Sequence, residues 1–332
     1  MIEEVVNGIY RIEVPLPQTP LKALNAYLIK GNNRHLLVDN GFNRPECREA
    51  LLGGLNQLAV SLEQVDMFIT HLHADHCGLT ADLLRPDTTV YSSAGDGAVI
   101  NQMTEGSAFW SELLQEMAPH GCSAEWLHSL ETSHPAIRFG PSGPVCFTPL
   151  REGEVLQYGT FSLRVLSVPG HTPDHLALFE PHLKILLSGD VILGDISPNI
   201  SHWREMPDAL GAYLHSLDKL DTLDISLTLP GHRSLVHNTG ERIEALRQHH
   251  AHRLNEVRGI LKGKSLNAFE VAASMTWALR GAAWKDFLTP QQWFATNEAL
   301  SHLEHLVARG EAVRQNANKG IRFSLSCSAW PA

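Results

Sequence analysis

The sequence is poor in cysteine and has no long apolar run. Its 332 residues include five cysteines, scattered without Cys-x-x-Cys spacing: Cys47, Cys77, Cys122, Cys146 and Cys327. This scatter argues against a disulfide framework and a zinc–thiolate site, and it favours a reducing compartment. No stretch approaches the roughly 18 consecutive apolar residues that span a bilayer. The chain opens with Glu3 and Glu4 in place of the basic segment of a secretory signal, so we expect a cytoplasmic protein with no membrane partner.

Basic residues are also scarce. The chain has 26 Lys and Arg against 36 Asp and Glu, a net charge of -10, so its bulk charge does not indicate a nucleic-acid partner. With 43% hydrophobic and 19% charged residues, the composition excludes disordered, collagen-like and coiled-coil classes. A chain of this length exceeds what one core usually supports, which predicts a large domain followed by a smaller one.

Strand-like and helix-like patterns alternate over roughly the first 230 residues. Apolar residues at helical spacing predict helices over 45–58 and 78–84. Apolar runs bounded by turn residues predict strands at 9–14, 26–30, 36–38, 65–69, 89–91, 161–168, 176–179, 185–187 and 226–229. The alternation is typical of an α/β fold with a mixed sheet.

Residues 96–140 interrupt this alternation with helical patterns. The segment carries more apolar side chains than a plain connection requires, among them Trp110 and Met117. Two interpretations remain open here. The segment is either a helical pair that covers the sheet or a lid over a pocket.

From about Gly240 the pattern changes to long helices. A first helix is predicted over 241–261, and Asn267 with Glu270 and Thr289-Pro290 with Gln292 are typical of helix starts. The last helix runs to 309 and is followed by a polar hairpin over 312–325. Helix, helix and hairpin is the order of a winged-helix module. We therefore predict two domains, 1–240 and 241–332.

Seven metal-binding side chains each follow a predicted strand. Four of them lie within six residues after the strand at 65–69, and the other three follow later strands: His71, His73, Asp75, His76, His171, Asp190 and His232. Imidazole nitrogens and carboxylate oxygens are a mixture that zinc and similar divalent ions bind. Seven such residues at one sheet edge can fill two metal sites.

These residues resemble the signature of the metallo-β-lactamase superfamily, whose His-x-His-x-Asp-His motif stands here at 71–76. The resemblance covers residues 1 to about 240 and implies an αββα sandwich. It implies one site made of His71, His73 and His171, a second made of Asp75, His76 and His232, and Asp190 as the bridge between them. It also implies that Asp39, which closes an early strand, supports a ligand histidine.

The resemblance implies a dinuclear metal-dependent hydrolase. Two divalent ions, zinc first and iron or manganese as alternatives, would lower the pKa of a bridging water from 15.7 toward about 7 and give a hydroxide nucleophile. We therefore assign Asp75 and Asp190 to catalysis as well as to the metals. His175, four residues after His171, is assigned to catalysis too, in contact with substrate or with a ligand. Cys77 is not expected to be a ligand.

Other motifs bear on the branch of the superfamily. Asp190 argues against an antibiotic hydrolase, because true metallo-β-lactamases lack the bridging aspartate. Leu193 stands where quorum-quenching lactonases carry a tyrosine, which weakens a lactonase assignment. The motifs at 170–175 and 188–194 are similar to those of the β-lactamase-like protein 2 group, some of whose members are endoribonucleases. A metal-dependent endoribonuclease or phosphodiesterase is therefore the alternative to a small ester, thioester or lactone hydrolase.

Charge favours the small-molecule substrate. Residues 241–332 hold 12 Lys and Arg against 8 Asp and Glu, which leaves 14 against 28 in the metal domain. The helix at 290–309 has one basic residue, Arg309, so phosphate binding there would be weak. The predicted hairpin adds a modest basic wing made of Arg314, Lys319 and Arg322.

The predicted substrate pocket is walled by Trp110 from 96–140 and by Asn199 and His202 from the loop after Asp190. A non-catalytic ligand-binding or sensing protein is a further alternative. An exposed apolar face on the C-terminal helices would favour a homodimer. The remaining helical histidines are expected to be solvated: His249, His250, His252, His302 and His305.

Overall fold

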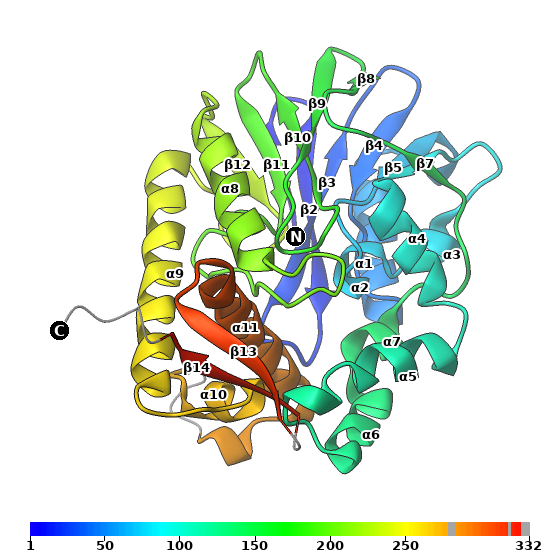
Figure 1. Ribbon diagram of the computed structural model, residues 1–332. Helices are drawn as coiled ribbons and strands as arrows, with labels where there is room; N and C mark the ends of the chain where they lie inside the picture. The colour runs from blue at the N-terminus through cyan, green and yellow to red at the C-terminus, as the bar shows by residue number, and fades with distance from the viewer. Residues whose placement is uncertain (278–282, 318–319, 327–332) are drawn as a thin grey trace.

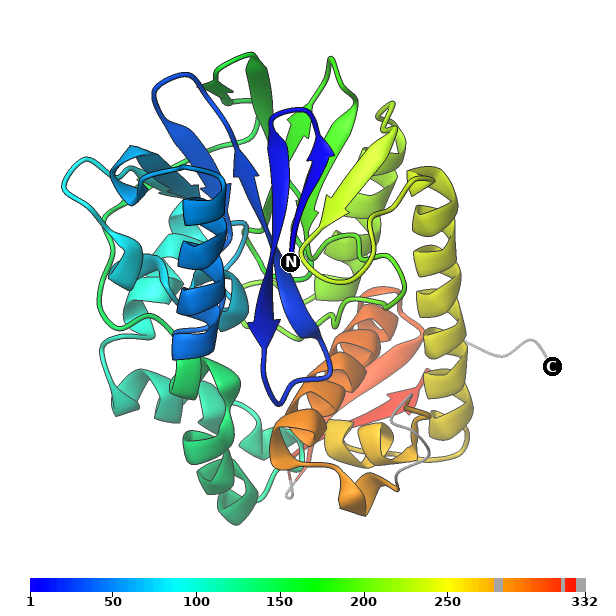
Figure 2. The same ribbon diagram turned by 180° about the vertical axis from the view of Figure 1, so that it is seen from behind.

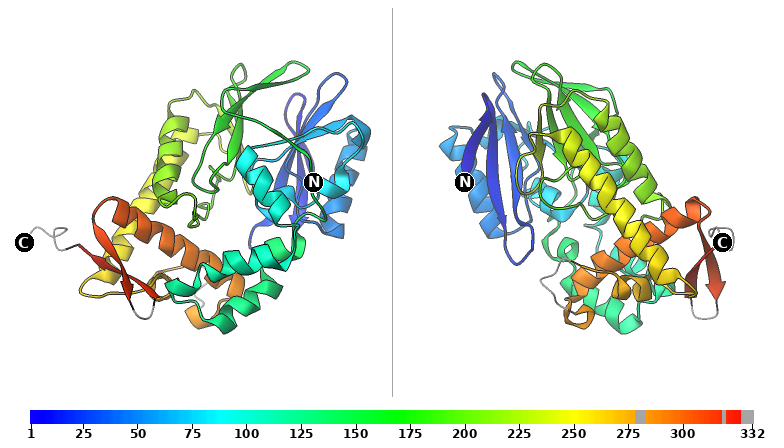
Figure 3. Two further views of the ribbon diagram at one scale, coloured as in Figure 1. Left: turned by 45° about the vertical axis from the view of Figure 1, so that its right-hand side comes forward. Right: turned by 90° about the vertical axis from the view of Figure 1, so that its left-hand side faces the viewer.

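Two β-sheets face each other and helices cover their outer faces, as the computed structural model shows for residues 1–277, 283–317 and 320–326 (Figure 1, Figure 3). The first sheet has seven strands in the order β1 to β7, and the second has five in the order β12-β11-β10-β9-β8. The predicted αββα sandwich is therefore confirmed. Each layer follows from the sequence pattern of its strands and helices.

The first sheet begins as an antiparallel meander and continues in parallel from β4 to β7. Its strands are β1 (Ile2–Val6), β2 (Ile9–Leu16), β3 (Lys22–Ile29), β4 (His35–Val38), β5 (Val65–Phe68), β6 (Val90–Ser92) and β7 (Phe147–Pro149). Its outer face is covered by α1 (Pro45–Gln57), α2 (Ala74–Cys77) and α3 (Thr80–Leu83). The sequence prediction missed β1, because Glu3 and Glu4 in its middle break the apolar run, as suits an edge strand.

The second sheet is antiparallel except for its β11–β12 pair. Its strands are β8 (Val155–Tyr158), β9 (Phe161–Ser167), β10 (Leu176–Glu180), β11 (Ile185–Gly189) and β12 (Leu227–Pro230). The helices α8 (Ala209–Asp221) and α9 (Thr239–Leu261) cover it. Every residue of β10 and β11 is buried, because one face meets the first sheet and the other meets these helices. One apolar core fills the space between the sheets and includes Tyr27, Phe68 and Leu178.

The segment predicted as 96–140 is helical and lies at one end of the two sheets, beside the C-terminal helices (Figure 3). It contains α4 (Ala94–Gln102), α5 (Ser107–Gln115), α6 (Ala124–Ser133) and α7 (Pro135–Phe139). Two short 3-10 turns, η1 (Leu62–Gln64) and η2 (Ala118–His120), join neighbouring elements. Because α6 contacts α11, this segment and the C-terminal part close around the same space.

The C-terminal part follows the predicted order of helices and hairpin (Figure 2). It contains α10 (Ala268–Ser274), η3 (Trp284–Asp286), α11 (Thr289–Ala308), β13 (Ala312–Ala317) and β14 (Gly320–Leu325). The capping box between Asn267 and Glu270 is confirmed. At α11 the side chain that returns to the first turn is Gln291, which accepts from Leu288 N, one residue before the predicted Gln292. The largest apolar core joins this part to α6 and α8, so packing is continuous across residue 240.

Most of the helical histidines are buried, so the expectation of solvated rings was wrong for them. His250 on α9 and His302 on α11 are fully buried, and their ring nitrogens lie 3.2 Å apart. His305 is buried beside Asp208. The reason is that α11 packs against α6, α8 and α9 together, which covers its polar side chains as well as its apolar ones. His252 is exposed as expected and His249 is half-buried.

The burial and length of the helices bear on two expectations, a homodimer and the lack of a membrane partner. The apolar side chains of α11 between Trp293 and Leu306 are buried within the chain, except for the half-buried Phe294. This helix therefore offers no fully exposed apolar face for a homodimer, and the homodimer stays a prediction. Within the described ranges, each helix is either too short or too polar to cross a membrane.

His134 gives the folded state a pH-dependent stability. Burial against Trp110, Trp293 and Phe294 lowers the pKa of His134 to about 4, below the ordinary 6.5. The unfolded chain therefore takes up a proton between pH 6.5 and 4 that the folded chain refuses, and stability falls as the pH falls through that window. We expect protonation of His134 in the unfolded chain to lower the free energy of unfolding by about 2 kcal/mol when the pH falls from 7 to 5.

Urea unfolding at the two pH values measures this loss. In His134→Asn, which keeps an acceptor for the Ala136 N–H at the start of α7, the difference between pH 7 and pH 5 should shrink by about that 2 kcal/mol. The exposed His252→Asn serves as the control and should leave the difference unchanged. A pH dependence that is the same in all three proteins would contradict the assignment.

Candidate metal centre

The seven predicted ligands lie just after the carboxyl ends of four strands, β5, β9, β11 and β12. His71, His73 and the α2 residues Asp75 and His76 follow β5, Asp190 follows β11 and His232 follows β12. His171 follows β9 on the loop that leads into β10. Since β4 and β5 are parallel in one sheet and β11 and β12 are parallel in the other, their carboxyl ends meet at one edge of the sandwich. The structure therefore collects all seven side chains at the place where sequence reasoning put them.

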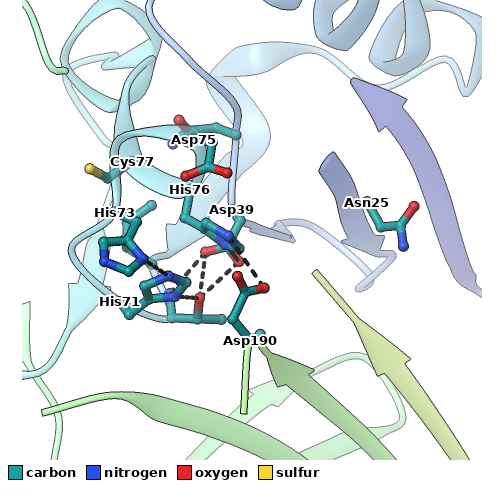
Figure 4. A network of polar contacts seen from close by, with 12 residues as sticks. Asn25, Asp39, His71, His73, Asp75, His76, Cys77 and Asp190 are labelled. Atoms are coloured by element: carbon teal, nitrogen blue, oxygen red, sulfur yellow. Dashed lines mark hydrogen bonds and ion pairs between the residues drawn. The ribbon is translucent and has the colours of Figure 1, made fainter. Parts of the chain in front are cut away.

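The ligand atoms form three overlapping groups, each with atoms within 4.8 Å of one another: His71, His73 and His171; His71, His76 and Asp190; Asp75, His76 and His232. Asp190 lies between them. Its Oδ1 is 3.5 Å from His76 Nε2, and its Oδ2 is 3.7 Å from His171 Nε2 and 3.5 Å from His232 Nε2. Figure 4 shows the side chains of His71, His76, Asp39 and Asp190 pointing toward one another. The central position of Asp190 is the one that a bridging ligand requires.

Three of the histidines have one ring nitrogen fixed by an acceptor outside the cluster. His76 Nδ1 donates to Asp39 Oδ2 at 2.7 Å, and His171 and His232 donate from Nδ1 to the carbonyl oxygens of Asn199 and Ala23, each at 2.8 Å. These bonds set the tautomer, so the Nε2 lone pair of each ring faces the cluster. The structure thus places Asp39 where the resemblance implied it, against a ligand histidine.

The two carboxylates of the cluster favour the ionised form, and its histidines differ in the direction of their pKa shifts. Burial lowers the pKa of His71 well below its ordinary value and that of His73 to about 3. Burial alone would raise the pKa of Asp75 and Asp190, but neighbouring imidazoles, His232 first, lower that of Asp75 to about 2 and that of Asp190 well below its ordinary value. The same carboxylates, together with Asp39, raise the pKa of His76 and His232, so a divalent ion bound between these carboxylates and imidazoles would displace the protons of those two rings.

Two buried ligand atoms lack a hydrogen-bond partner among the described residues: His171 Nε2 and Asp190 Oδ1. A buried polar atom without a partner carries a free-energy cost that a bound cation would remove. The residues present therefore fit a metal centre.

His175 lies behind the ligands. It is fully buried, its ring stacks on that of His71 with centroids 4.7 Å apart, and its Nε2 accepts from the Asp190 N–H at 3.1 Å. This position suits a residue that holds His71 and Asp190 in place more than one that touches substrate. Cys77 points away from the cluster toward the carbonyl of Leu72 (Figure 4).

Several supporting residues were missed by sequence reasoning. Asn25 on β3 donates from Nδ2 to the carbonyl oxygens of Pro230 and Arg233, and so ties the first sheet to the loop that carries His232. Asp96 accepts from Leu72 N at 3.0 Å and from Thr172 Oγ1 at 2.7 Å, and so joins the two loops that carry the histidines of the first group. Nothing around Asn25 in the sequence marks it, because it lies inside an apolar strand.

A large cavity opens onto the cluster. Its volume is about 1230 Å³, and His73, Asp75, His171 and Asp190 line its inner end. The three predicted pocket residues, Trp110, Asn199 and His202, also line it. The walls come from the turn between β2 and β3, from α4 to α7, from the loop after Asp190 and from α11. Both parts of the chain thus contribute to the space in front of the ligands.

A model of the family described as "Metallo-beta-lactamase superfamily" matches residues 20–232. The chain belongs to the metallo-β-lactamase superfamily. A solved metallo-beta-lactamase family protein from Thermus thermophilus is 29% identical, with a TM-score of 0.83, and the match covers 97% of this chain and 100% of that one. That relative therefore shares the architecture of nearly the whole chain, the C-terminal part included.

Curated relatives in the superfamily agree with a hydrolase. The Bacillus subtilis protein named "Probable metallo-hydrolase YqjP" is 28% identical over 81% of this chain and 85% of its own length. The "Beta-lactamase-like protein 2 homolog" of Caenorhabditis elegans is 24% identical over 85% of this chain and 82% of its own, which agrees with the predicted resemblance. The "Atrochrysone carboxyl ACP thioesterase" of Emericella nidulans is 22% identical over 73% of this chain and 61% of its own length. The chain is a metal-dependent hydrolase of this superfamily.

A series of hydrogen bonds connects the candidate metal ligands of this hydrolase to the C-terminal helices. His171 donates to the carbonyl of Asn199, and the Asn199 side chain donates to Glu298 Oε2 at 2.9 Å and to the carbonyl of Phe294 at 3.2 Å. Glu298 is buried on α11, and its Oε1 lies 3.7 Å from Arg253 Nε on α9. The position of His171 therefore depends on residues more than 80 positions further along the chain.

Proposed function

We propose that the seven clustered side chains hold two divalent metal ions, zinc first and iron or manganese as alternatives, and that the chain hydrolyses an ester, thioester or lactone. His71, His73 and His171 would hold one ion, Asp75, His76 and His232 the other, and Asp190 would bridge them. The observation that carries this proposal is the central position of Asp190, which lines the cavity. Its carboxylate oxygens lie 3.5 to 3.7 Å from the Nε2 atoms of His76, His171 and His232.

When bound, such ions polarise a carbonyl and lower the pKa of a coordinated water from 15.7 to about 7. The chain's own residues orient and shield the site. The carboxylate of Asp39 holds His76 in the tautomer that presents Nε2. Trp203 donates from Nε1 to the carbonyl of His171 at 3.2 Å and stacks its ring on His73, so it limits the access of bulk water to the first group. Within this proposal Asp75 and Asp190 remain ionised ligands, and His175 positions Asp190.

The relatives support an ester-type substrate. One of them is named as a thioesterase, and a thioester and an ester present the same carbonyl to the site. We also keep as proposals a catalytic domain of 1–240, a winged-helix-like domain of 241–332 and a cytoplasmic location. The helical insertion 96–140 is proposed either to cover the sheet or to act as a lid.

Endoribonuclease activity is the second candidate from the resemblance, and the charges of the hairpin weigh against it. Arg314 lies 3.3 Å from Glu304, and Arg322 lies 3.0 Å from Glu270, so both wing cations already face carboxylates. Lys319 lies outside the described residues. A phosphate backbone would have to displace these ion pairs, which favours the small-molecule substrate.

A substrate panel tests the proposal. Metal-loaded protein is assayed on p-nitrophenyl acetate, a simple thioester, a lactone, a phosphodiester and single-stranded RNA at 50 and 200 mM salt. We expect turnover of the carbonyl substrates that changes little with salt. Turnover of RNA instead, with an affinity that falls steeply as salt rises, would establish the second candidate. Two bound metals without turnover of any substrate would indicate a binding or sensing protein.

Asn199→Ala tests the link between the metal cluster and α11. The carbonyl that accepts from His171 remains in this variant, but the loop loses its bonds to Glu298 and Phe294. We expect metal affinity to fall about tenfold, the lower end of what supporting residues of metal ligands contribute. Metal titration by calorimetry measures it. Glu298→Gln keeps an acceptor for the Asn199 amide and should stay near wild type, whereas Glu298→Leu should match Asn199→Ala. Equal affinity in all four proteins would contradict the link.

A further inference from the structure

The cavity in front of the metal cluster is large for a small ester. Ligand pockets commonly measure about 300–1000 Å³, and this one measures about 1230 Å³. A small ester or lactone would occupy its inner end near His73 and Asp190 and leave the space toward α5 and α11 unfilled. The size of the cavity therefore calls for a substrate with a large group attached to the reacting carbonyl.

The side walls of the cavity are apolar and aromatic. Six large side chains from four separate segments define them: Phe42, Met103, Trp110, Phe139, Trp203 and Trp293. Trp110 and Trp293 are almost completely buried, and both rings pack on His134. Walls of this kind gain free energy by removing apolar surface of a ligand from water. The large group of the substrate is therefore apolar.

The charged side chains that line the cavity are mainly acidic. Its lining includes Glu105, Glu112, Glu116 and Glu205 but no lysine among the described residues. Of its two arginines, Arg204 hydrogen-bonds Glu116 at 3.0 Å and lies 3.6 Å from Glu112. The other, Arg138, lies over the ring of Phe139 with its guanidinium 4.7 Å from the ring centroid. A phosphate-bearing group would meet these carboxylates, so the substrate carries no strong negative charge.

Two uncharged histidines belong to the wall of the cavity. His120 and His202 line the cavity with ring centroids 6.3 Å apart, and the Nδ1 of each is buried without a hydrogen-bond partner among the described residues. Burial lowers the pKa of both to about 4, so they are uncharged at neutral pH. As uncharged rings they present no positive charge to a phosphate group.

We infer that the substrate of this hydrolase is an uncharged ester or thioester with a large apolar group on one side of the scissile bond, and that this group lies between α5 and α11. The inference rests on the proposed ester hydrolysis. It excludes coenzyme A thioesters and nucleic acids as the preferred substrates. The group could be the acyl chain or the alkyl leaving group, and the experiment has an arm for each.

The test compares substrates that differ in one part. One series extends the acyl chain of p-nitrophenyl esters from acetate to octanoate, and the other extends the alkyl part of acetate thioesters from methyl to octyl. In one of the two series kcat/KM should rise at least about thirtyfold. For one octanoyl group, the uncharged N-acetylcysteamine thioester should exceed the coenzyme A thioester by at least about tenfold, and more at low salt.

Variants that fill the cavity test whether the effect of substrate chain length arises from binding beside α4 and α5. Leu113→Trp on α5 should lower kcat/KM for the octyl or octanoyl substrate about tenfold and leave the acetate or methyl member of the series unchanged. Val99→Trp on α4 fills the cavity from another side and should act alike, which guards against a folding defect in one variant. Leu214→Trp on α8 is the matched control, since Leu214 is also half-buried but does not line the cavity.

The outcomes separate the two proposals. Turnover of acetate with no rise along either series, or coenzyme A thioesters preferred over uncharged ones, would overturn this inference and leave ester hydrolysis standing. An absence of turnover on every ester and thioester would overturn both. A rise along one series that Leu113→Trp and Val99→Trp leave unchanged would place the apolar group elsewhere and overturn the inference as well.

Discussion

Replacing Asp190 by alanine is expected to reduce ester hydrolysis by at least about a thousandfold. Asp190 lies within 3.5 to 3.7 Å of His76, His171 and His232, so it is the one ligand shared by both proposed ions. A bound dication stabilises the transition state by several kcal/mol, and about 4 kcal/mol corresponds to three orders of magnitude in rate. Steady-state kinetics on the best ester, with metal content determined on the same sample, measures the effect. Metal content should fall below that of the wild type.

Asp195→Ala is the control for Asp190→Ala. Asp195 lies five residues further along the same loop, and its side chain is exposed and outside the cavity lining. Its removal should leave both the rate and the metal content near wild type. If Asp190→Ala kept more than a tenth of the wild-type rate, the bridging role proposed for Asp190 would be wrong, even though the fold is that of the superfamily.

Gly170→Ala is expected to lower the free energy of unfolding by at least about 3 kcal/mol. Gly170 has φ +134°, which L side chains rarely adopt, and a Cβ there would lie 2.4 Å from Cα of Tyr213. Tyr213 is fully buried on α8, so the helix cannot move aside without opening the core. Because His171 is the next residue, the change should also weaken metal binding. Urea unfolding and metal titration measure the two effects.

Gly259→Ala is the control for this substitution. Gly259 lies on α9, and nothing is within 4 Å of the position where a Cβ would stand. Alanine there should be neutral or stabilise by up to about 1 kcal/mol, because glycine weakens a helix interior. If Gly170→Ala proved as stable as Gly259→Ala, the close approach of this loop to α8 would not be a constraint on the fold.

The ligands could be predicted from the sequence because each follows an apolar strand. The runs before His71 and His232 are short and bounded by turn residues, so their strand character and their ends were both readable. Parallel pairing then brings such ends together, and the β4–β5 and β11–β12 pairs do so in the structure. Asp39, at the end of β4, was implied by the resemblance to the superfamily and not by this pattern. The local sequence pattern was sufficient to predict ligand residues that directly follow a strand.

Tertiary packing decided what the pattern could not show. His250 and His302 lie in helices rich in polar residues, and only the meeting of α9 with α11 buries them. Asn25 and Glu298 act on loops about 200 and 100 residues away in the chain, and nothing in their own neighbourhoods indicates a partner. The cavity likewise exists because α5, α7 and α11 close around one space. Such contacts depend on the whole fold, so sequence periodicity carries no signal for them.

Hydrogen bonds from His171 through Asn199 to Glu298 connect the C-terminal part to the proposed active site. That part does more than cover the second sheet, since it shares one core with α6 and α8 and supplies Trp293 and Phe294 to the cavity wall. A change on α11 can therefore affect both the ligand His171 and the bound substrate. This view predicts that activity and C-terminal packing are lost together on heating.

Adding metal back to the metal-free protein is the decisive test of the dinuclear site. The metals are removed with a chelator, and zinc, iron or manganese is returned in known amounts while ester turnover is followed. We expect no turnover in the metal-free protein and a rise to a plateau at two equivalents of metal per chain. Full turnover without metal, or a plateau at one equivalent with Asp190→Ala unaffected, would contradict the dinuclear site.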